Sequence, residues 1–450
     1  MYPCGMLELD CAQDFDPAAD QEFFAKLPHT SGVLLIEMTD PAARPYLART
    51  SDIGRLAERL LRVPEAPTKG LNLRSVAARV RYRIAGSKFE QLFAHYQQAR
   101  ARFPHQYPEL VRLRPPAMLK INLRNAHPRC YVTRRVRSDD GFYFGPFASR
   151  KEAESFNGKL LDLFKTRRCK IKIRRDPAFP GCIYSEMNMC LAPCFAGCTK
   201  EEYENEVSRL IDTLKTSGAF LVQAVERERE AASEALDFER AASLHKRLDK
   251  IVSALRGRPE IAKHLKNLNA VILQRGAEEK TVAAFPVLGG IVSDPIWLRF
   301  AELSGEPRSV EAILRAGLEL PGDKIHFAEV AANSPVALGD STSDLPSETR
   351  DEQSHRVWLP TARAELSEHL SLVARWFYSN PRQGEIFFHE GEWPYRRILR
   401  ACARLMAETT APAGANLSGS DQASNQTGQI SRDKINRLKK FARMHRPPRK

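Results

Sequence analysis

The chain has 450 residues, which is too long for one hydrophobic core, so we expect several domains of ordinary size. Apolar residues make up 43% of the chain and charged residues 28%, and no apolar run approaches the roughly 18 residues that cross a bilayer. These features exclude an integral membrane protein. The sequence from Met1 has no basic segment followed by an apolar stretch, so we expect no secretory signal, no membrane partner and a cytoplasmic protein.

The basic residues exceed the acidic ones and are clustered. Lys and Arg number 69 against 55 Asp and Glu, which gives a formal net charge of +14. The excess is concentrated in three segments: 74–137, 165–175 and 432–450. Clustered cations are typical of a protein that binds a polyanion, because each neutralised phosphate releases counterions. We therefore expect DNA as a partner, and the alternative is a solvated, Arg-rich surface.

The first expected domain covers residues 24–135. The apolar run Gly32 to Ile36 predicts a strand, and the prolines that follow predict a turn before a hairpin partner at Tyr46-Leu47. Apolar residues then recur at helical spacing over 51–62 and again over 89–96. The pattern predicts a small α/β domain.

The second stretch, 136–199, holds cysteines between Gly and Pro residues. Cys169, Cys182, Cys190 and Cys194 are spaced so that four thiolates can meet around a tetrahedral zinc or an iron-sulfur cluster. A reducing compartment disfavours disulfides, so ligation is the better interpretation. Spacing alone does not choose between the two groups, and Cys198 is either a substitute ligand or a bystander.

The remaining chain divides into three stretches. Residues 200–258 lack proline and predict a long helix followed by a helical hairpin or two helices. Residues 268–408 predict strands at 270–273, at 281–285 and through Trp297, interrupted by a disordered polar insertion at about 334–355. The composition of residues 411–450 predicts a polar linker and a basic tail.

Several short motifs surround the cysteines: Tyr143 to Phe147, Leu160 to Phe164, Arg168-Cys169, Cys182 to Tyr184 and Met189 to Cys194. With these motifs, the centre of the chain resembles UvrC, a family of bacterial excinuclease proteins. The resemblance implies that the four cysteines hold a [4Fe-4S] cluster rather than zinc, with a structural role that fixes a basic loop against DNA. The side chains that we expect to contact DNA are Arg134, Arg135, Arg167, Arg168, Lys170 and Lys172.

A helical motif within about 232–255 follows the cysteines. Ala241, Leu244, Leu248 and Ile251 share one helical face, which on periodicity alone describes an amphipathic helix of a bundle. The string Leu236 to Ile251 is also similar to the UVR motif of the same family, although His245 replaces the usual arginine. That resemblance implies docking of a UvrB-type protein, through Phe238, Glu239, Ala241, Ala242, Leu244, Leu248 and Ile251.

The first domain keeps the outline of a GIY-YIG nuclease domain but departs from its chemistry. The family uses two tyrosines, an arginine, and a glutamate that binds Mg²⁺ or Mn²⁺. This chain has Leu34 at the first tyrosine position, Ala48 at the glycine of the second motif and His95 where the glutamate is expected. The catalytic candidates are Tyr46 and Arg55, with Arg59 as a second arginine. Glu90 or His95 would bind metal only in a shifted register, so we expect a domain that no longer cuts DNA and in which Tyr46 is equally a packed strand residue.

These features together predict an α+β multidomain protein. Its expected parts are the GIY-YIG-like domain, a Cys-rich metal module, a UVR helical hairpin and a partial RNase H-like C-terminal domain without its catalytic aspartate motif. The favoured function is a DNA-binding protein of nucleotide excision repair, with a family link to the SOS response. The alternatives are an endonuclease that makes one metal-dependent incision, and an iron-sulfur or zinc adaptor outside repair.

Overall fold

The computed structural model describes residues 7–63, 70–136, 141–300, 310–319 and 352–407. They form two compact units. The first combines residues up to Arg114 with those from Leu268 to Thr410, and the second runs from Pro115 to Asn267. Both units contain antiparallel sheets and helices, in agreement with the expected α+β class.

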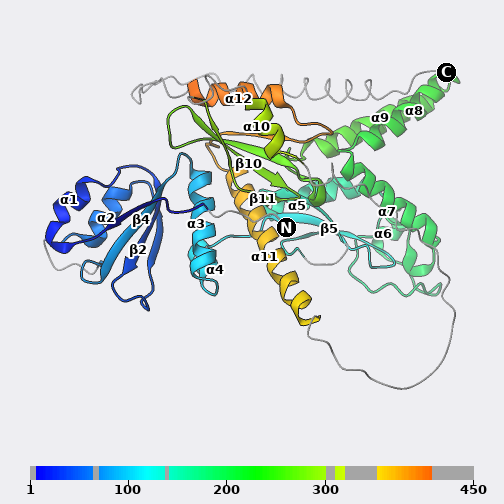
Figure 1. The fold of residues 1–450 in the computed structure, drawn as a ribbon. Coiled ribbons are helices and arrows are strands. Elements are labelled where there is room, and N and C mark those ends of the chain that lie inside the picture. The colour runs from blue at the N-terminus through cyan, green and yellow to red at the C-terminus, as the bar shows by residue number, and fades with distance from the viewer. Residues whose placement is uncertain (1–6, 64–69, 137–140, 301–309, 320–351, 408–450) are drawn as a thin grey trace, which may run out of the picture. The chain divides into compact units, whose positions relative to one another are not determined.

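The N-terminal half of the first unit is built on a four-stranded antiparallel sheet with helices on both faces. Its strand order is β1 (Cys11–Asp14), β4 (Ala77–Ile84), β2 (Gly32–Met38), β3 (Tyr46–Thr50). The predicted hairpin of β2 and β3 is confirmed, with Ile36 opposite Tyr46. Figure 1 shows the first two helices on one face of the sheet and the third on the other; these are α1 (Asp20–Ala25), α2 (Ile53–Leu61) and α3 (Lys88–Arg102).

Short polar residues begin the two longer helices. Asp52 accepts a hydrogen bond from the Arg55 backbone N–H at 2.8 Å, which starts α2, and Ser87 accepts one from the Glu90 N–H at 3.1 Å, which starts α3. Helix α2 falls within the stretch 51–62 whose apolar spacing predicted it, and α3 includes the stretch 89–96 and continues to Arg102. A short helix, α4 (Tyr107–Val111), follows α3.

The C-terminal half of the first unit contains a second antiparallel sheet. Four strands lie in the order β11 (Ile291–Val292), β10 (Thr281–Leu288), β9 (Ala270–Arg275), β13 (Glu385–Phe388), and β12 (Ile296–Arg299) also pairs with β10. The strands predicted at 270–273, at 281–285 and through Trp297 are confirmed. Three helices belong to this half: α10 (Val310–Gly317), α11 (Glu352–Phe377) and α12 (Tyr395–Ala407). The RNase H-like character that we expected is not confirmed.

Helices α3 and α11 join the two halves of the first unit, which the sequence had suggested were separate domains. The Tyr96 hydroxyl donates to Glu368 Oε2 at 2.8 Å, and the Phe89 and Phe285 rings meet edge to face with centroids 5.0 Å apart. At Gly86 the backbones approach so closely that a Cβ would lie 2.1 Å from the carbonyl carbon of Gly276. Only glycine fits there.

The second unit begins with a sheet that the sequence had assigned partly to the first domain. Its order is β6 (Cys130–Thr133), β5 (Ala117–Ile121), β7 (Phe142–Phe147), β8 (Lys263–His264). Because β5 pairs with β7, residues 117–133 belong with the cysteine region rather than with residues 24–114. The sheet packs against α5 (Arg150–Leu161) in one apolar core.

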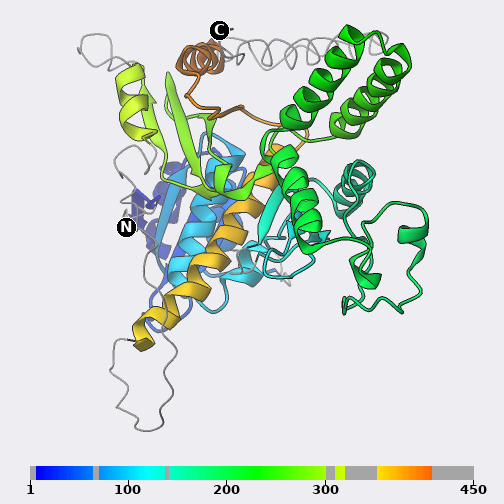
Figure 2. The same cartoon turned by 90° about the vertical axis from the view of Figure 1, so that its right-hand side faces the viewer.

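The cysteines follow α5 in a loop with little regular structure, and three helices come after it. The loop contains only α6 (Ile183–Glu186) and a 3-10 turn at Pro193–Phe195. The next helices are α7 (Lys200–Lys215), α8 (Ala219–Glu234) and α9 (Phe238–Arg256). Figure 2 shows α8 and α9 side by side as a hairpin, which confirms the prediction of a long helix followed by two more.

Two predicted features fall largely outside the part of the chain that the structure describes. The insertion at about 334–355 is one, except that its last four residues begin α11, and the linker and tail at 411–450 are the other. Among the described helices, none is long and apolar enough to cross a membrane.

Candidate nucleic-acid interface and the expected nuclease residues

Tyr46 lies on the sheet face that α1 and α2 cover. Successive side chains of a strand point to opposite faces, and Tyr46 packs with Ala48 against the core formed by Leu34, Ile36 and the helices. Leu34 stands directly opposite Ala48. Tyr46 is therefore a half-buried strand residue among apolar neighbours.

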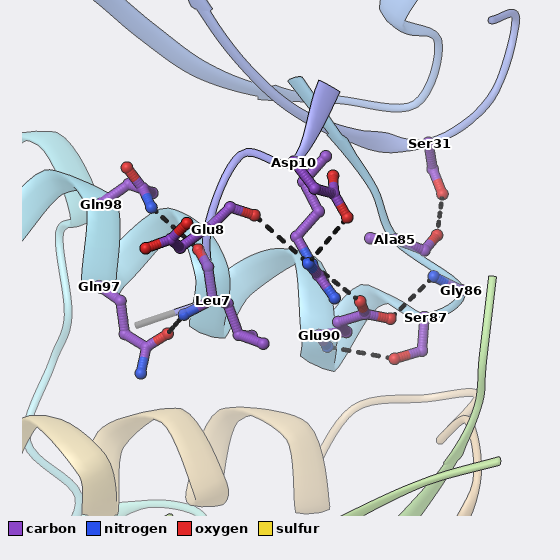
Figure 3. Close-up of polar contacts among 11 residues, drawn as sticks. Leu7, Glu8, Asp10, Ser31, Ala85, Gly86, Ser87, Glu90, Gln97 and Gln98 are labelled. Carbon is purple, nitrogen blue, oxygen red and sulfur yellow. Dashed lines mark hydrogen bonds and ion pairs between the residues drawn. The ribbon is translucent and has the colours of Figure 1, made fainter. Parts of the chain in front are cut away.

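Glu90 lies on the other side of the same sheet. Tyr82 of β4 belongs to the core around Tyr46, so the next residue, Arg83, points to the opposite face of the sheet. Arg83 Nε lies 3.4 Å from Glu90 Oε1, which places Glu90 on that opposite face. The Gly86 backbone N–H donates to Glu90 Oε2 at 2.9 Å, as Figure 3 shows. The Glu90 side chain is fully buried, and burial raises the pKa of this carboxyl. These interactions describe a residue that holds the turn between β4 and α3.

His95 is also buried on the face away from Tyr46. It is 5% exposed, and its Nδ1 has no hydrogen-bond partner among the residues that the structure describes. Burial and the nearby Arg49 guanidinium lower the pKa of His95 to about 4, so the imidazole is neutral at pH 7. Arg49 follows Ala48 in β3 and so points away from Tyr46.

The nuclease candidates are thus not brought together. Tyr46 faces α1 and α2, whereas Glu90 and His95 lie across the sheet, and Arg55 is exposed on α2. Among the residues that the structure describes, no group of three or more His, Cys, Asp or Glu side chains is placed to hold a metal ion. The described part of the first domain therefore does not bring Tyr46 together with Glu90 or His95.

The four cysteines of the central loop lie within electrostatic reach of one another. Burial raises the pKa of Cys190 to about 11, and Cys169, Cys182 and Cys194 raise it as neighbouring thiols. The Ala192 N–H lies 3.3 Å from Cys190 Sγ, an N–H···S interaction of the kind found around ligated cysteines. Cys198 packs in the adjoining apolar core and is as buried as Cys190 and Cys194, and Cys194 lies near enough to contribute to its raised pKa.

The backbone of this loop is strained around the cysteines. Asn188, Ala192 and Ala196 all adopt the left-handed conformation, which costs alanine roughly 1 kcal/mol. Two of them flank Cys194, and the third lies two residues before Cys190. Thiolates are the donors that zinc and iron-sulfur clusters require, but among the described residues these four thiols are not placed as a group that could hold a metal ion.

The basic residues around the loop fall into two groups. Lys170, Lys172, Arg134 and Arg135 are exposed, as DNA binding requires. Arg167 differs from the expectation: it is 5% exposed and donates from Nε to the His127 carbonyl and from a terminal nitrogen to the Ile171 carbonyl, both at 2.8 Å.

Arg168 is also largely engaged within the protein. Its guanidinium lies 2.9 Å from Asp162. Arg167 is therefore a structural residue, and Arg168 keeps only part of its side chain for a partner. Charge in the sequence located the segment but could not separate these buried arginines from their exposed neighbours.

The helical motif also divides into an inner and an outer part. Leu244 and Ile251 are buried in the core of the second unit, and Ala241 and Leu248 pack against that core. Four of the seven residues expected to bind a partner therefore hold the hairpin together.

The other three residues of the motif, Phe238, Glu239 and Ala242, are exposed. At the turn between α8 and α9, Leu236 is 71% exposed and Phe238 is 69% exposed, and the sequence prediction had not included Leu236 among the partner-binding residues.

Comparisons with known proteins confirm the resemblance at the centre of the chain. Residues 117–213 match the family model of the UvrC/Cho excinuclease middle domain. The UvrABC system protein C of Desulfatibacillum aliphaticivorans is 26% identical over 333 residues, which are 74% of this chain and 48% of that protein. The corresponding protein of Nitratidesulfovibrio vulgaris is 36% identical over 135 residues, 29% of this chain and 19% of that protein. The chain thus spans at most about half the length of these curated relatives, and no solved structure matches it.

Proposed function

We propose, from the premise that the chain is a divergent member of the UvrC family, that it is a DNA-binding protein of nucleotide excision repair. In this proposal it docks a UvrB-type protein and does not cut DNA with its first domain. The observation that carries the proposal is the content of residues 117–213, where the family match, the four cysteines and the exposed basic side chains coincide.

DNA binding is supported by the exposed cations around the cysteine loop. Lys170 and Lys172 are exposed two residues apart, and no ion pair with another described residue engages them. Free lysines bind phosphates as point charges, and removal of one such lysine makes the slope of log affinity against log salt shallower by about one.

The test is the pair Lys170→Glu and Lys172→Glu in the full chain, with fluorescence anisotropy on a labelled duplex across a salt series. We expect at least a tenfold loss of affinity and a shallower salt slope. Lys151→Glu and Lys159→Glu place the same charge change on exposed lysines of α5 and serve as the matched control. Equal effects in both pairs would reject the loop as the DNA surface.

The cysteines are proposed to hold a [4Fe-4S] cluster, with Cys169, Cys182, Cys190 and Cys194 as ligands. When bound, such a group supplies a structural anchor that fixes the basic loop, and its positive charge stabilises the thiolates whose pKa burial otherwise raises. Iron, sulfide and zinc analysis of anaerobically purified protein, together with its visible spectrum, tests the assignment. A colourless protein with one zinc per chain would replace the cluster by zinc.

Partner docking is proposed for the turn of the α8–α9 hairpin. Leu236 and Phe238 are large apolar side chains that stay mostly exposed, next to charged residues of both helices. An aromatic anchor within a polar rim is the usual composition of a binding hot spot. The buried leucines of the motif would then act indirectly, by holding the turn in shape.

The first domain is proposed to be inactive as a nuclease. Phosphodiester hydrolysis requires an activated water, charge neutralisation and a metal in one place. Tyr46 on one face of the sheet and Glu90 and His95 on the other cannot supply them together without refolding of the sheet.

A further inference from the structure

A pocket of about 300 Å³ lies in the second unit, beside the cysteine loop. One wall comes from the end of α5 and the residues after it, with Leu161 and Phe164. A second comes from the loop residue Met189, and Lys250 of α9 completes the lining. The pocket is therefore assembled from the cysteine loop and the helical hairpin, both of which belong to the same unit.

The charges around this pocket are predominantly positive. Lys165, Arg168 and Lys250 line it, against a single acid, Asp162, which is already paired with Arg168 at 2.9 Å. Neither lysine forms an ion pair with any residue that the structure describes; Lys165 Nζ instead donates to the neutral Asn188 side chain at 2.9 Å. The pocket thus offers two uncompensated cations to an anion.

The floor of the pocket is apolar. Leu161, Leu163, Phe164 and Met189 line it, and of these Leu161 and Phe164 are almost fully buried in the core of the unit. A cavity of this volume is at the lower end of the range for small ligands, about 300–1,000 Å³, so it accepts one nucleotide-sized group and not a duplex. An apolar surface next to cations fits a nucleotide, which has a stacking face and a phosphate.

We propose that this pocket binds a single nucleotide of the DNA strand, with its phosphate at Lys165 and Lys250 and its base against Leu161, Phe164 and Met189. The inference rests on the proposed function and adds a site to it. Because Lys165 precedes the cysteine loop and Lys250 lies on the hairpin, one nucleotide that touches both connects DNA binding to the element proposed to dock the partner.

The first test uses the full chain and a duplex with an internal single-stranded tract of 2-aminopurine nucleotides. Binding should change the 2-aminopurine fluorescence, and Lys250→Glu and Lys165→Glu should remove most of that change. Lys246→Glu, one turn earlier on α9 and outside the pocket, is the matched control and should leave the change intact. Lys250→Gln repeats the test with a smaller perturbation, and circular dichroism of each variant verifies folding. An equal response of Lys250→Glu and Lys246→Glu would overturn the proposal.

The second test does not depend on DNA binding by the whole chain. Deoxyadenosine monophosphate is titrated into the protein with selectively labelled methionine methyl groups, and the Met189 signal is followed by NMR. We expect a saturable shift that Lys250→Glu weakens at least fivefold and that inorganic phosphate at the same concentration does not reproduce. If the protein binds no duplex but shows this shift, the proposed DNA-binding function is rejected and the nucleotide pocket is still supported. No shift, or an equal shift with inorganic phosphate, would reject the nucleotide.

Discussion

At the scale of single residues, burial decides the role of the titratable side chains in the first unit. His95 and His369 are almost fully buried, and the Val292 N–H donates to His369 Nδ1 at 2.9 Å, so His369 carries its proton on Nε2. Burial is the main cause that lowers the pKa of each to about 4, with Arg49 facing His95, and Glu365 and Arg100 near His369. Burial shifts the pKa of Glu90 in the opposite direction: it raises the pKa, because the charged form of a carboxyl is its deprotonated form.

The two histidines make the first unit sensitive to acid. A histidine whose folded pKa lies below its unfolded value of about 6.5 favours the unfolded state as it takes up a proton. The free energy of unfolding should therefore fall as the pH drops from about 6.5 to 4, by up to about 3 kcal/mol for each histidine.

Urea unfolding across this pH range measures the effect. His369→Gln should flatten the dependence relative to the wild type, whereas His105→Gln, at an exposed histidine, should not. Glu90 is present in both proteins, so its contribution to the pH dependence cancels when the two are compared. Identical pH dependence in His369→Gln and the wild type would contradict the assignment.

Arg167 and Lys170 show how neighbouring basic residues divide between structure and binding. Arg167→Ala removes a buried guanidinium bonded to two backbone carbonyls, so we expect a loss of about 2–4 kcal/mol in the free energy of unfolding. Lys170→Ala should change stability by less than about 0.5 kcal/mol, because the side chain is exposed. Denaturant melts of both variants test the contrast, and a stable Arg167→Ala protein with weakened DNA binding would restore Arg167 as a DNA-binding residue.

At the scale of elements, the α8–α9 hairpin has buried residues that hold it together and exposed residues that we propose dock a partner. Leu244→Ala and Ile251→Ala remove buried side chains and should each lower the free energy of unfolding by about 2–4 kcal/mol. Leu236→Ser with Phe238→Ser should leave the melt nearly unchanged and weaken capture of a UvrB-type protein at least tenfold. Phe220→Ser, at an exposed phenylalanine at the other end of the hairpin, is the matched control. If the UvrB-type protein still binds after Leu236 and Phe238 are replaced, the turn is not the docking surface.

Elements with strong local periodicity were predictable from the sequence, and those that depend on distant partners were not. The β2–β3 hairpin, α2 and the three helices after the cysteines follow from apolar spacing, turn residues and the absence of proline. The strand β1 lies before the expected start of the first domain. It was not predicted from the sequence, because the strand is defined by pairing with β4, more than sixty residues away. The pairing of β5 with β7 moved a domain boundary for the same reason.

At the scale of the whole molecule, the join between the two halves of the first unit could not be inferred from sequence. Tyr96 and Glu368 are 272 positions apart, and neither carries a pattern that indicates the other. The same limit applies to the nuclease candidates. Leu34, Ala48 and His95 differ from the residues of the nuclease family, which indicated from the sequence that catalytic groups are missing. Only the strand register shows that Tyr46 and Glu90 lie on opposite faces of the sheet. The spacing of the cysteines predicted that they lie near one another, and three of them contribute to the raised pKa of Cys190; their role as ligands stays a prediction.

The central claim is that this protein binds DNA but does not cut it with its first domain. The most direct measurement is incision of a lesion-bearing duplex by the full chain with a UvrB-type protein and Mg²⁺ or Mn²⁺, comparing the wild type with Tyr46→Phe. We expect stable binding of the duplex and no incised strand in either protein. A strand incised by the wild type and left intact by Tyr46→Phe would contradict the account.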